Sequence, residues 1–543
     1  METAYSPKKA PHKVTPLPCP CMLWPAFPSS QNSLTLTSPK FGMRTMLQLR
    51  DTLTKEGPAF GYYPNPLKTW LVTKEGFHTI GSTTFHQTGV NVTPDGRPYL
   101  GSPIGSPGYM ESFAESKVAS WSALVTNLAD IANTQPHAAY SALNHGLSSK
   151  WTYMCRTTPS RIMSQRLAPL DEALRKKLIP SLTGTPPPND TEYTLFALPA
   201  REGGLGIRIP SKQATHEYNA SLFVTSALCN HIIKQDTHYG QEIISESLMA
   251  KSTVGQQNRD RTKNDINTLT PLLSTNMQRS VNLSKEKGAS SWLTTLPLKT
   301  HGFTLHKQAF RDALSLRYGW TPNKLPSKCA CGSSFTVEHV LSCAKGGFPS
   351  IRHNEIRDLT ADLLSEVCNN VCTEPELLPV TGENLAGASA NIQPGARLDI
   401  AANGVWGGSF ERTYFDVRVF NPHAASNRHT DPQTVYRKHE QIKKRAYEQR
   451  ILDIEQASFS PLVLSATGGL AREATTFYKR LASMLASKWD QSYSSTLCWL
   501  RCRLTFSLLR SSIQAIRGSR SSSGHPFRSG AIDLVISETH LHQ

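Results

Sequence analysis

The spacing of apolar residues divides the chain into a mainly helical first part and a second part in which helix and strand patterns alternate. Residues 111–150 and 155–260 show the apolar spacing of helices. Stretches rich in proline and glycine at 184–190 and 201–210 interrupt this pattern. The polar segment 251–300, which carries charges of both signs, is expected to be a helical linker.

Two turn-and-strand patterns precede these helices. A helix-like run begins at Met43 and ends at Gly57 and Pro58, which form a helix-stop signal. Within 62–74, apolar and aromatic residues follow a Pro-Asn-Pro turn, and within 93–105 a second apolar stretch follows a Pro-Asp-Gly turn. We expect a short strand in each segment.

Beyond about residue 350, the pattern favours a different architecture. Residues 354–368 have apolar positions at helical spacing, so we expect one amphipathic helix there. Residues 396–402 and 413–420 favour short strands. A helix, a strand and two more helices follow at 433–454, 461–466, 471–489 and 495–516. This order predicts an α/β layer with a small mixed sheet.

Length and composition predict several domains rather than one core. The chain has 543 residues, of which 38% are apolar and 36 are proline. A prior of about 150 residues per domain gives three or so domains. The frequent prolines predict irregular segments between them.

The chain is strongly basic. Its 58 Lys and Arg residues exceed its 41 Asp and Glu residues by 17, and a surplus of this size commonly serves a polyanionic partner. Nucleic acid is the leading candidate, and a merely soluble basic protein is the alternative. No window approaches the roughly 18 consecutive apolar residues of a membrane span. Lys8, Lys9 and the nearby prolines leave no signal-peptide core, so we expect no membrane partner and a reducing compartment.

Four potential metal ligands lie close together in the sequence. They are Cys329, Cys331, His339 and Cys343. They supply the number of soft or borderline ligands that a closed tetrahedral zinc site requires. His339 and Cys343 are spaced for one turn of helix, and since no open ligand position is evident, we expect a structural zinc site. The alternative is that the cysteines are buried as small apolar residues beside a core histidine.

Two aspartates interrupt strongly apolar, strand-like runs. Asp399 lies in Arg-Leu-Asp-Ile, and Asp416 follows seventeen positions later in Tyr-Phe-Asp-Val-Arg. An acid in such a run is costly to bury unless it is paired or binds a metal. Carboxylates on adjacent strand ends are a simple way to hold the divalent ion that phosphodiester hydrolysis needs. The alternative is that both acids lie in loops or form salt bridges with Arg397 and Arg418.

A lysine from the charged helix at 433–454 completes this candidate constellation. Lys443 falls between two apolar stripes of the helix, so it is expected to project along the partly buried face. The stripes are Val435, Ile442 and Ala446, and Tyr436, Tyr447 and Ile454. A lysine placed in this way could orient the attacking water or stabilise the phosphate in the transition state. Lys438, at the edge of the same helix face, is the alternative candidate for this role. Lys444 and Arg445 are expected to point toward solvent. The alternative is that these cations solvate the helix or contact phosphate nonspecifically.

Taken together, these residues resemble a known family, the reading frame of site-specific LINE-type (non-LTR) retrotransposons with a C-terminal restriction-like endonuclease of the PD-(D/E)xK type. The resemblance covers about residues 44–516 and is strongest over 329–490. The family has a Cys/Cys/His/Cys knuckle, an Arg-His pair, Glu-Pro and then an acidic nuclease core. The matching residues here are the four knuckle ligands, Arg352 and His353, Glu374 and Pro375, Arg397 to Asp399, Asp416 to Arg418, and Lys443 with Tyr447.

Two residues depart from the family pattern. Leu398 replaces the proline before the first core aspartate, and Arg418 stands where the Asp/Glu-x-Lys tripeptide has lysine. The resemblance therefore implies that the catalytic lysine comes from the helix, as Lys443. It further implies Mg²⁺ or Mn²⁺ at the nuclease site and Zn²⁺ in the knuckle. The implied roles are metal binding by Asp399 and Asp416, an extra metal ligand in Glu374, a nearby Tyr447, and nucleic-acid binding by Arg352, His353, Lys438, Lys444 and Arg445.

The upstream half resembles the end of a reverse transcriptase. The motif from Gly57 to Thr69 is similar to the segment after the palm active site, and Tyr99 to Gly105 to the primer-grip hairpin. The polymerase palm needs two adjacent aspartates for its metals, and this sequence contains no Asp-Asp pair. We therefore expect that the chain begins after the polymerase active site and does not synthesise DNA unaided.

The resemblance implies a multidomain fold class with a mixed α/β palm-end remnant, a mainly α thumb and linker, a small zinc knuckle and an α/β endonuclease domain. The expected boundaries are a disordered segment or gene-model artefact (1–43), the palm-end remnant (44–110), the thumb-like region (111–265), the linker (266–327), the knuckle (328–348), the endonuclease (349–517) and a disordered tail (518–543).

The expected function is nicking of target DNA for target-primed reverse transcription, with DNA and element RNA as partners. The resemblance implies a nuclear location. One alternative is a catalytically dead transposon remnant that only binds nucleic acid. A more remote alternative is a host DNA-repair or resolvase-like enzyme.

Overall fold

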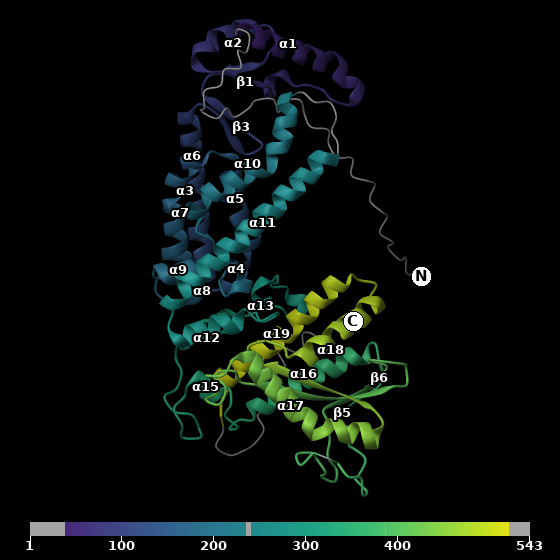
Figure 1. Cartoon of the computed structure of the whole chain (residues 1–543). Helices are drawn as coiled ribbons and strands as arrows, with labels where there is room; N and C mark the ends of the chain where they lie inside the picture. The colour runs from purple at the N-terminus through teal and green to yellow at the C-terminus, as the bar shows by residue number, and fades with distance from the viewer. Residues whose placement is uncertain (1–38, 235–240, 386, 521–543) are drawn as a thin grey trace, which may run out of the picture. The chain divides into compact units, whose positions relative to one another are not determined.

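The computed structural model describes residues 39–234, 241–385 and 387–520. Within these ranges the protein is mixed α/β and mainly helical, with a parallel strand pair, a hairpin and a four-stranded sheet (Figure 1). The chain divides into two compact units. The first comprises 1–113, 155–162 and 215–260, and the second comprises 114–154, 163–214 and 261–543. The thumb-like region expected at 111–265 thus contributes residues to both units.

The first unit contains the two small sheets. β1 (Trp70–Val72) pairs in parallel with β2 (Asn91–Thr93), and β3 (Gly96–Tyr99) forms an antiparallel hairpin with β4 (Ser102–Gly105). The hairpin turns at Leu100 and Gly101, whose φ angles of 47° and 83° suit a tight turn with left-handed backbone at both central positions. The strands expected within 62–74 and 93–105 are therefore confirmed.

Helix α1 (Pro39–Glu56) begins earlier than expected, because Pro39 to Gly42 belong to it rather than to an irregular segment. The remainder of that expected segment, and the part of the expected tail after residue 520, lie outside the described residues. Arg520 lies within the described residues and packs against the α/β domain, with its guanidinium carbon 4.6 Å from the centre of the Phe348 ring.

The helical interpretation of 111–150 and 155–260 is confirmed. α2 (His78–Thr84) lies in the first unit, and α3 (Pro107–Ala132), α5 (Ser148–Thr157), α6 (Ser160–Arg166), α10 (Pro210–Lys234) and α11 (Gln241–Leu269) contribute residues to both units. The second unit also contains α4 (Pro136–Ala142), α7 (Ala168–Ala173), α8 (Ile179–Thr183) and α9 (Asp190–Ala197). No helix in the described ranges combines the length and apolar character needed to cross a membrane.

The segment that we expected to be a linker is packed into the second unit. It contains α12 (Thr275–Ser284), α13 (Ser291–Thr294) and α14 (Lys307–Tyr318). The last two pack against α19 (Tyr493–Arg517), and Trp292 and Phe310 are buried. Buried aromatic residues of this size contribute core packing. The linker interpretation is therefore wrong for these helices.

Residues 348–517 form a four-stranded sheet with helices on both faces. The strand order is β5 (Asn369–Thr373), β6 (Ile400–Asn403), β7 (Arg412–Phe420) and β8 (Ser458–Ser465). The first two pairings are antiparallel, and β7 pairs in parallel with β8. The main helices are α16 (Phe348–Ser365), α17 (Pro432–Arg450), α18 (Arg472–Lys488) and α19. All the elements expected here are confirmed, and β5 is an additional strand.

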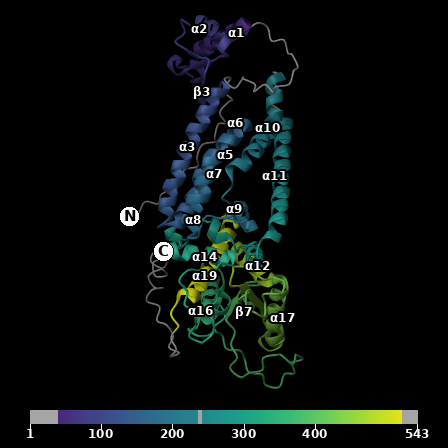
Figure 2. The same cartoon turned by 90° about the vertical axis from the view of Figure 1, so that its left-hand side faces the viewer.

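Alternation along β7 separates the two faces of the sheet. Phe415 and Val417 pack in a core with residues of α16, α18 and α19. Tyr414 and Phe420 lie on the other face of the sheet, which α17 covers. Successive side chains of a strand point to opposite faces, so Asp416 also belongs to the α17 face. Figures 1 and 2 show α17 on one side of the sheet and α16 on the other.

Helix α17 runs opposite to β7 along this face. Its first turn packs Tyr436 on Phe420, with ring centres 5.0 Å apart, and Ile451 beyond its end packs with Tyr414. Arg279 of α12 fixes the connection that precedes α17, because its guanidinium donates hydrogen bonds to the carbonyls of Pro422, Asn427 and Thr430. The side chains that α17 carries therefore have a defined register on β7.

Candidate functional site

Two carboxyl groups lie side by side at the centre of the sheet. Asp416 lies in the middle of β7, and Asp399 directly precedes β6. The N–H of Asp399 donates to the carbonyl of Phe415 at 3.1 Å, and the N–H of Val417 donates to Oδ2 of Asp399 at 2.6 Å. These bonds, which flank Asp416, set the side chain of Asp399 beside it. We call Asp399 and Asp416 the carboxyl pair.

A basic side chain contacts each member of the carboxyl pair. Lys443 Nζ of α17 lies 2.9 Å from Oδ1 and 2.8 Å from Oδ2 of Asp416. His353 Nε2 of α16 lies 2.9 Å from Oδ1 of Asp399. The helices on opposite faces of the sheet therefore each supply one basic side chain to the same site. The prediction that Lys443 projects along the partly buried face of α17 is confirmed, although Ile442, which we placed in an apolar stripe, is 48% exposed.

The two acids differ in electrostatic environment. Burial raises the pKa of Asp416 to about 6, and the neighbouring Asp399 adds to this shift while Lys443 opposes it. Burial acts in the same direction on Asp399, but the hydrogen bonds from His353 and the Val417 N–H bring its pKa below the ordinary value. Neighbouring carboxyl groups with pKa values pushed apart are typical of functional sites.

This difference predicts opposite stability effects for two isosteric substitutions. Without a divalent ion, Asp416→Asn should raise the melting temperature at pH 7 to 8, since the fold favours the neutral carboxyl. In the unsubstituted chain, the raised pKa of Asp416 stabilises the fold at pH values below the pKa of the unfolded state, which is near 3.8. This stability is lost as the pH rises through about 6, the pKa of the folded state. The advantage of Asp416→Asn should therefore disappear below about pH 4.

Asp399→Asn is the matched control, and it should lower the melting temperature at neutral pH, since a lowered pKa stabilises the fold above the unfolded value. Thermal unfolding in buffer prepared without magnesium and without a chelator measures both. Equal shifts of the same sign in both variants would contradict this electrostatic description.

The structure brings the remaining predicted catalytic residues near the site, but with other partners. The backbone N–H of Glu374 donates to the carbonyl of Asp399, yet its exposed carboxylate forms an ion pair with Arg357. Tyr447 lies one turn beyond Lys443, whose Nζ is 6.0 Å from the centre of the ring. Its hydroxyl accepts a hydrogen bond from Asn391 Nδ2 at 3.2 Å.

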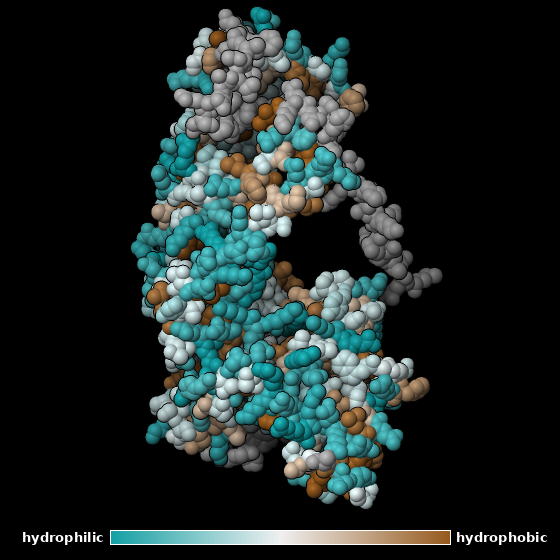
Figure 3. Space-filling view, in the orientation of Figure 1, coloured by the Kyte–Doolittle hydropathy of each residue, from teal (hydrophilic) through white to brown (hydrophobic). Residues whose placement is uncertain are grey.

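The predicted nucleic-acid contacts fall into two groups. Lys438 and Arg445 are exposed on α17, and the surface over this helix is mainly hydrophilic (Figure 3). Lys444 forms ion pairs with Glu473 and Glu448. The other predicted contacts, Arg352 and His353, are not free surface cations.

Arg352 is only 3% exposed, and its guanidinium donates to the carbonyl of Leu341 at 3.0 Å. This burial corrects the expectation of a nucleic-acid contact, because no guanidinium surface remains for a phosphate. His353 hydrogen-bonds Asp399 instead, which sequence analysis did not predict. The spacing of His353 and Arg357, four residues apart on one helix face, is the pattern that could have indicated that both serve the acidic site.

The four predicted zinc ligands come together. Their ligand atoms all lie within 4.8 Å of one another. Cys329 Sγ is 3.8 Å from Cys343 Sγ, and Cys331 Sγ is 3.1 Å from His339 Nε2. A tetrahedral zinc ion with Zn–S bonds of about 2.3 Å would separate two sulfurs by roughly 3.8 Å. Cys329, Cys331, His339 and Cys343 therefore form a group that could hold a metal ion such as zinc.

Local backbone geometry explains this convergence. Lys328 and Ser334, which lie on either side of the first two ligands, form an isolated antiparallel bridge, and Gly332 turns the chain between them with a φ of 91°. Thr336 then caps α15 (Val337–Val340) by accepting a hydrogen bond from the N–H of His339. The helix ends before Cys343, so the expectation that one helical turn holds both His339 and Cys343 is wrong.

Residues 328–348, which carry the four predicted zinc ligands and are called the zinc module below, are joined to the α/β domain by hydrogen bonds. Asn421, directly after β7, donates to the carbonyl of Glu338 at 2.8 Å and to Ser342 Oγ at 2.9 Å. Arg352 of α16 ties the same module through Leu341, which also packs with Phe348. The module thus contacts both the strand that carries Asp416 and the helix that carries His353.

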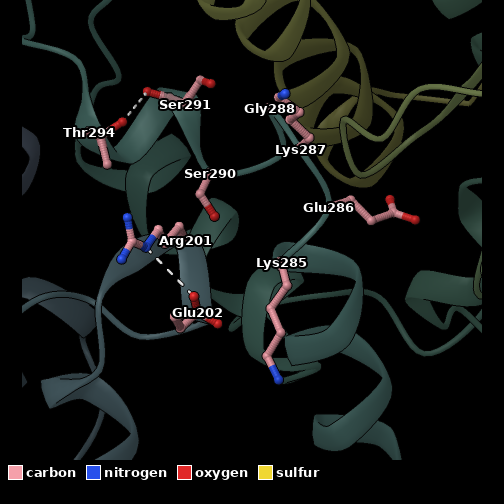
Figure 4. A pocket seen from close by; sticks show the side chains of 9 residues that line it. All are labelled: Arg201, Glu202, Lys285, Glu286, Lys287, Gly288, Ser290, Ser291 and Thr294. Atoms are coloured by element: carbon pink, nitrogen blue, oxygen red, sulfur yellow. Dashed lines mark hydrogen bonds and ion pairs between the residues drawn. The ribbon is translucent and has the colours of Figure 1, made fainter. Parts of the chain in front are cut away.

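A separate hollow of about 380 Å³ lies elsewhere in the second unit (Figure 4). It is lined by Arg201, Glu202, Lys285, Glu286, Lys287, Gly288, Ser290, Ser291 and Thr294. Arg201 is paired with Glu202 at 3.6 Å. Glu286 points away from this pair in Figure 4, and it accepts a hydrogen bond from Tyr436. None of the residues that line the hollow belongs to the carboxyl pair.

No model of a known protein family matches the sequence, and comparison with curated proteins finds no significantly similar chain. The function of the chain is therefore inferred from the geometry of the carboxyl pair and of the basic side chains that contact it.

Proposed function

We propose that the α/β domain is a magnesium-dependent DNA endonuclease whose reacting phosphate binds at the carboxyl pair. The observation that carries this proposal is the meeting of Asp399, Asp416 and Lys443 on the α17 face of the sheet. A buried acid and a half-buried acid beside one lysine form an arrangement suited to phosphodiester hydrolysis. The strongly basic composition, with a formal charge of +17, supports a polyanionic substrate.

The donor set fits a divalent ion with hard oxygen ligands. Mg²⁺ is commonly held by one or two carboxylates, with waters and substrate phosphate completing its coordination. Asp399 and Asp416 would hold it, and a bound cation would offset the burial and the repulsion from Asp399 that raise the pKa of Asp416. Among the described residues, the carboxyl pair is not part of a group of three or more closely spaced potential ligands. Glu374, which is paired with Arg357, therefore remains only a proposed additional ligand.

The residues of the chain have distinct roles in this proposal. When bound, the ion activates water and neutralises charge that develops on the phosphate. Lys443 holds its ammonium beside Asp416, where it can donate hydrogen bonds to the phosphate oxygens in the transition state. His353 and the Val417 N–H each occupy an oxygen of Asp399, which fixes the orientation of that carboxylate.

We further propose that the protein acts in a LINE-type retrotransposon, where it nicks nuclear target DNA for target-primed reverse transcription together with element RNA. This wider role is supported by the order of the knuckle, Arg-His, Glu-Pro and acidic motifs along the sequence. The alternative, a protein that binds nucleic acid without cleaving it, is favoured only by the basic surface. Cleavage separates the two.

A nicking assay tests the proposal. Supercoiled plasmid DNA incubated with the full chain should be converted to the open-circular form with Mg²⁺ or Mn²⁺, and not in buffer without a divalent ion. The metal-free control should be made by dialysis, because a strong chelator would also attack the zinc module. DNA that is bound but remains supercoiled with either ion would reject the nuclease proposal in favour of the binding protein.

A further inference from the structure

An arginine interrupts the buried face of β7. Along this strand, every residue from Thr413 to Val417 is buried, and Phe420 is buried, whereas Arg418 is exposed. Arg418 lies two positions from Asp416, so both side chains belong to the face covered by α17. The guanidinium has no hydrogen-bond or ion-pair partner among the described residues. An exposed arginine with no carboxylate partner is therefore present at the edge of the carboxyl pair.

The surroundings of Arg418 are positively charged. His439 of α17 stacks on Phe420, with ring centres 4.8 Å apart. Burial lowers the pKa of His439 to about 4, and the positive charges of Arg418, Lys438 and Lys443 contribute to the shift. Burial also lowers the pKa of Arg352 to about 10, again with a contribution from Arg418. The charge of Arg418 contributes to both pKa shifts, although burial is the larger cause of each.

Lys438 is the second free cation of this surface. It is exposed on α17, next to His439, and no partner for its ammonium occurs among the described residues. His439 stacks on Phe420, which lies two positions from Arg418 on the same face of β7, and Lys438 directly precedes His439 on α17, so both cations lie near this ring. Lys443, by contrast, is paired with Asp416. Two uncompensated cations beside a proposed phosphate site favour binding of another anion.

We propose that Arg418 and Lys438 form a subsite for a second phosphate, the one that neighbours the scissile phosphodiester. This inference rests on the proposed function. Residues two apart on a strand are separated by about 6.7 Å, so the long side chain of Arg418 can reach a phosphate beyond the one at the carboxyl pair. The guanidinium can bind phosphate through two parallel hydrogen bonds, and Lys438 adds a point charge.

The subsite makes the site selective for polynucleotides. A small diester has one phosphate and leaves Arg418 and Lys438 without an anion. An internal linkage of a nucleic-acid strand supplies two phosphates at once, so the binding energy of the neighbouring phosphate is available at the reacting one. The site should therefore prefer an internal phosphodiester over a small aryl diester. This preference, the ratio of the two kcat/KM values, should be larger than it would be with only Lys443 and the carboxyl pair.

Salt dependence of DNA binding tests the subsite without cleavage. Fluorescence anisotropy with a labelled 20-base-pair duplex in Ca²⁺ should give an affinity for Arg418→Gln about tenfold weaker than for the unsubstituted chain. The slope of log affinity against log salt should become shallower by about 0.9, the contribution of one phosphate contact. Lys438→Gln should reduce the slope similarly. Arg418→Lys should retain the slope while it loses part of the affinity, since it keeps the charge but not the paired hydrogen bonds.

Lys479→Gln is the matched control for loss of one positive charge. Lys479 is exposed on α18, which packs on the opposite face of the sheet from α17. This variant should leave the slope unchanged. A slope that changes as much in Lys479→Gln as in Arg418→Gln, or in neither, overturns the subsite.

A cleavage comparison gives a second readout. Arg418→Gln should reduce kcat/KM for the duplex at least tenfold more than for bis(p-nitrophenyl) phosphate. Equal losses on the two substrates would overturn the subsite while the nuclease proposal stands. Duplex binding with a slope that depends on Arg418, but no cleavage of either substrate, would support the phosphate subsite and reject the nuclease. No duplex binding by the unsubstituted chain would reject both.

Discussion

Asp416→Ala is expected to lower the rate of magnesium-dependent nicking by on the order of 10³-fold, which corresponds to about 4 kcal/mol of transition-state stabilisation. Asp416 is 5% exposed and contacts both Asp399 and Lys443. Its removal would take away one of two proposed metal ligands and the partner that positions the ammonium. Single-turnover nicking of plasmid DNA at saturating Mg²⁺ measures the effect.

Two further variants complete this test. Asp399→Ala should cause a loss of similar size, and Lys443→Ala a loss of about 10²-fold, the typical effect of removing one electrostatic donor. Asp453→Ala is the matched control, because Asp453 is an exposed acid beyond the end of α17. It should nick at the rate of the unsubstituted chain. Nicking that persists in Asp399→Ala and Asp416→Ala, or that falls equally in Asp453→Ala, would remove the carboxyl pair from the mechanism.

The parts of this site that could be predicted from sequence are those determined by the spacing of apolar residues along one strand or one helix. An acid in the apolar run of β7 had to be buried on one face, and the stripes of α17 located Lys443 on the side toward the sheet. Both predictions depend on residues a few positions apart. That is why the expected strands and helices occur, although some bounds differ, as at the starts of α16 and β6, whereas the pairings between the elements required the structure.

The parts that could not be predicted depend on contacts distant in sequence. Arg352 and His353 are neighbours, yet one is buried against the zinc module and the other hydrogen-bonds Asp399. Strand β5 has an exposed and partly exposed pattern without strict alternation, so no period indicates it. Pairing with β6 organises it, and such tertiary override of local pattern is common for edge strands.

Arg418 is a different case. Its departure from the usual lysine was visible in the sequence, and we treated it as a lost catalytic group. Its side chain is exposed, whereas Lys443 is paired with Asp416. This difference suggests instead that Lys443 serves the reacting phosphate and Arg418 the neighbouring one. The sequence alone could not separate these interpretations, because Arg418 and Lys443 belong to different elements.

Removal of zinc is expected to unfold the zinc module and to lower nicking at least tenfold, even at saturating Mg²⁺. Structural zinc sites contribute directly to folding, with apparent binding free energies of about 10–16 kcal/mol. The module is fastened to β7 through Asn421 and to α16 through Arg352. Loss of the module would therefore disturb the strand that carries Asp416 and the helix that carries His353. Metal content, limited proteolysis of residues 328–348 and nicking should be measured on the same samples.

Two variants separate this coupling from general instability. Cys343→Ser should lose bound zinc, whereas Cys229→Ser, at an exposed cysteine of α10, should retain it and nick normally. Asn421→Ala leaves all four ligands in place but removes the hydrogen bonds that join the module to the end of β7. If the module positions the carboxyl pair, Asn421→Ala should retain zinc and nick more slowly. Full nicking by a chain that has lost its zinc, or by Asn421→Ala, would show that the module and the site are independent.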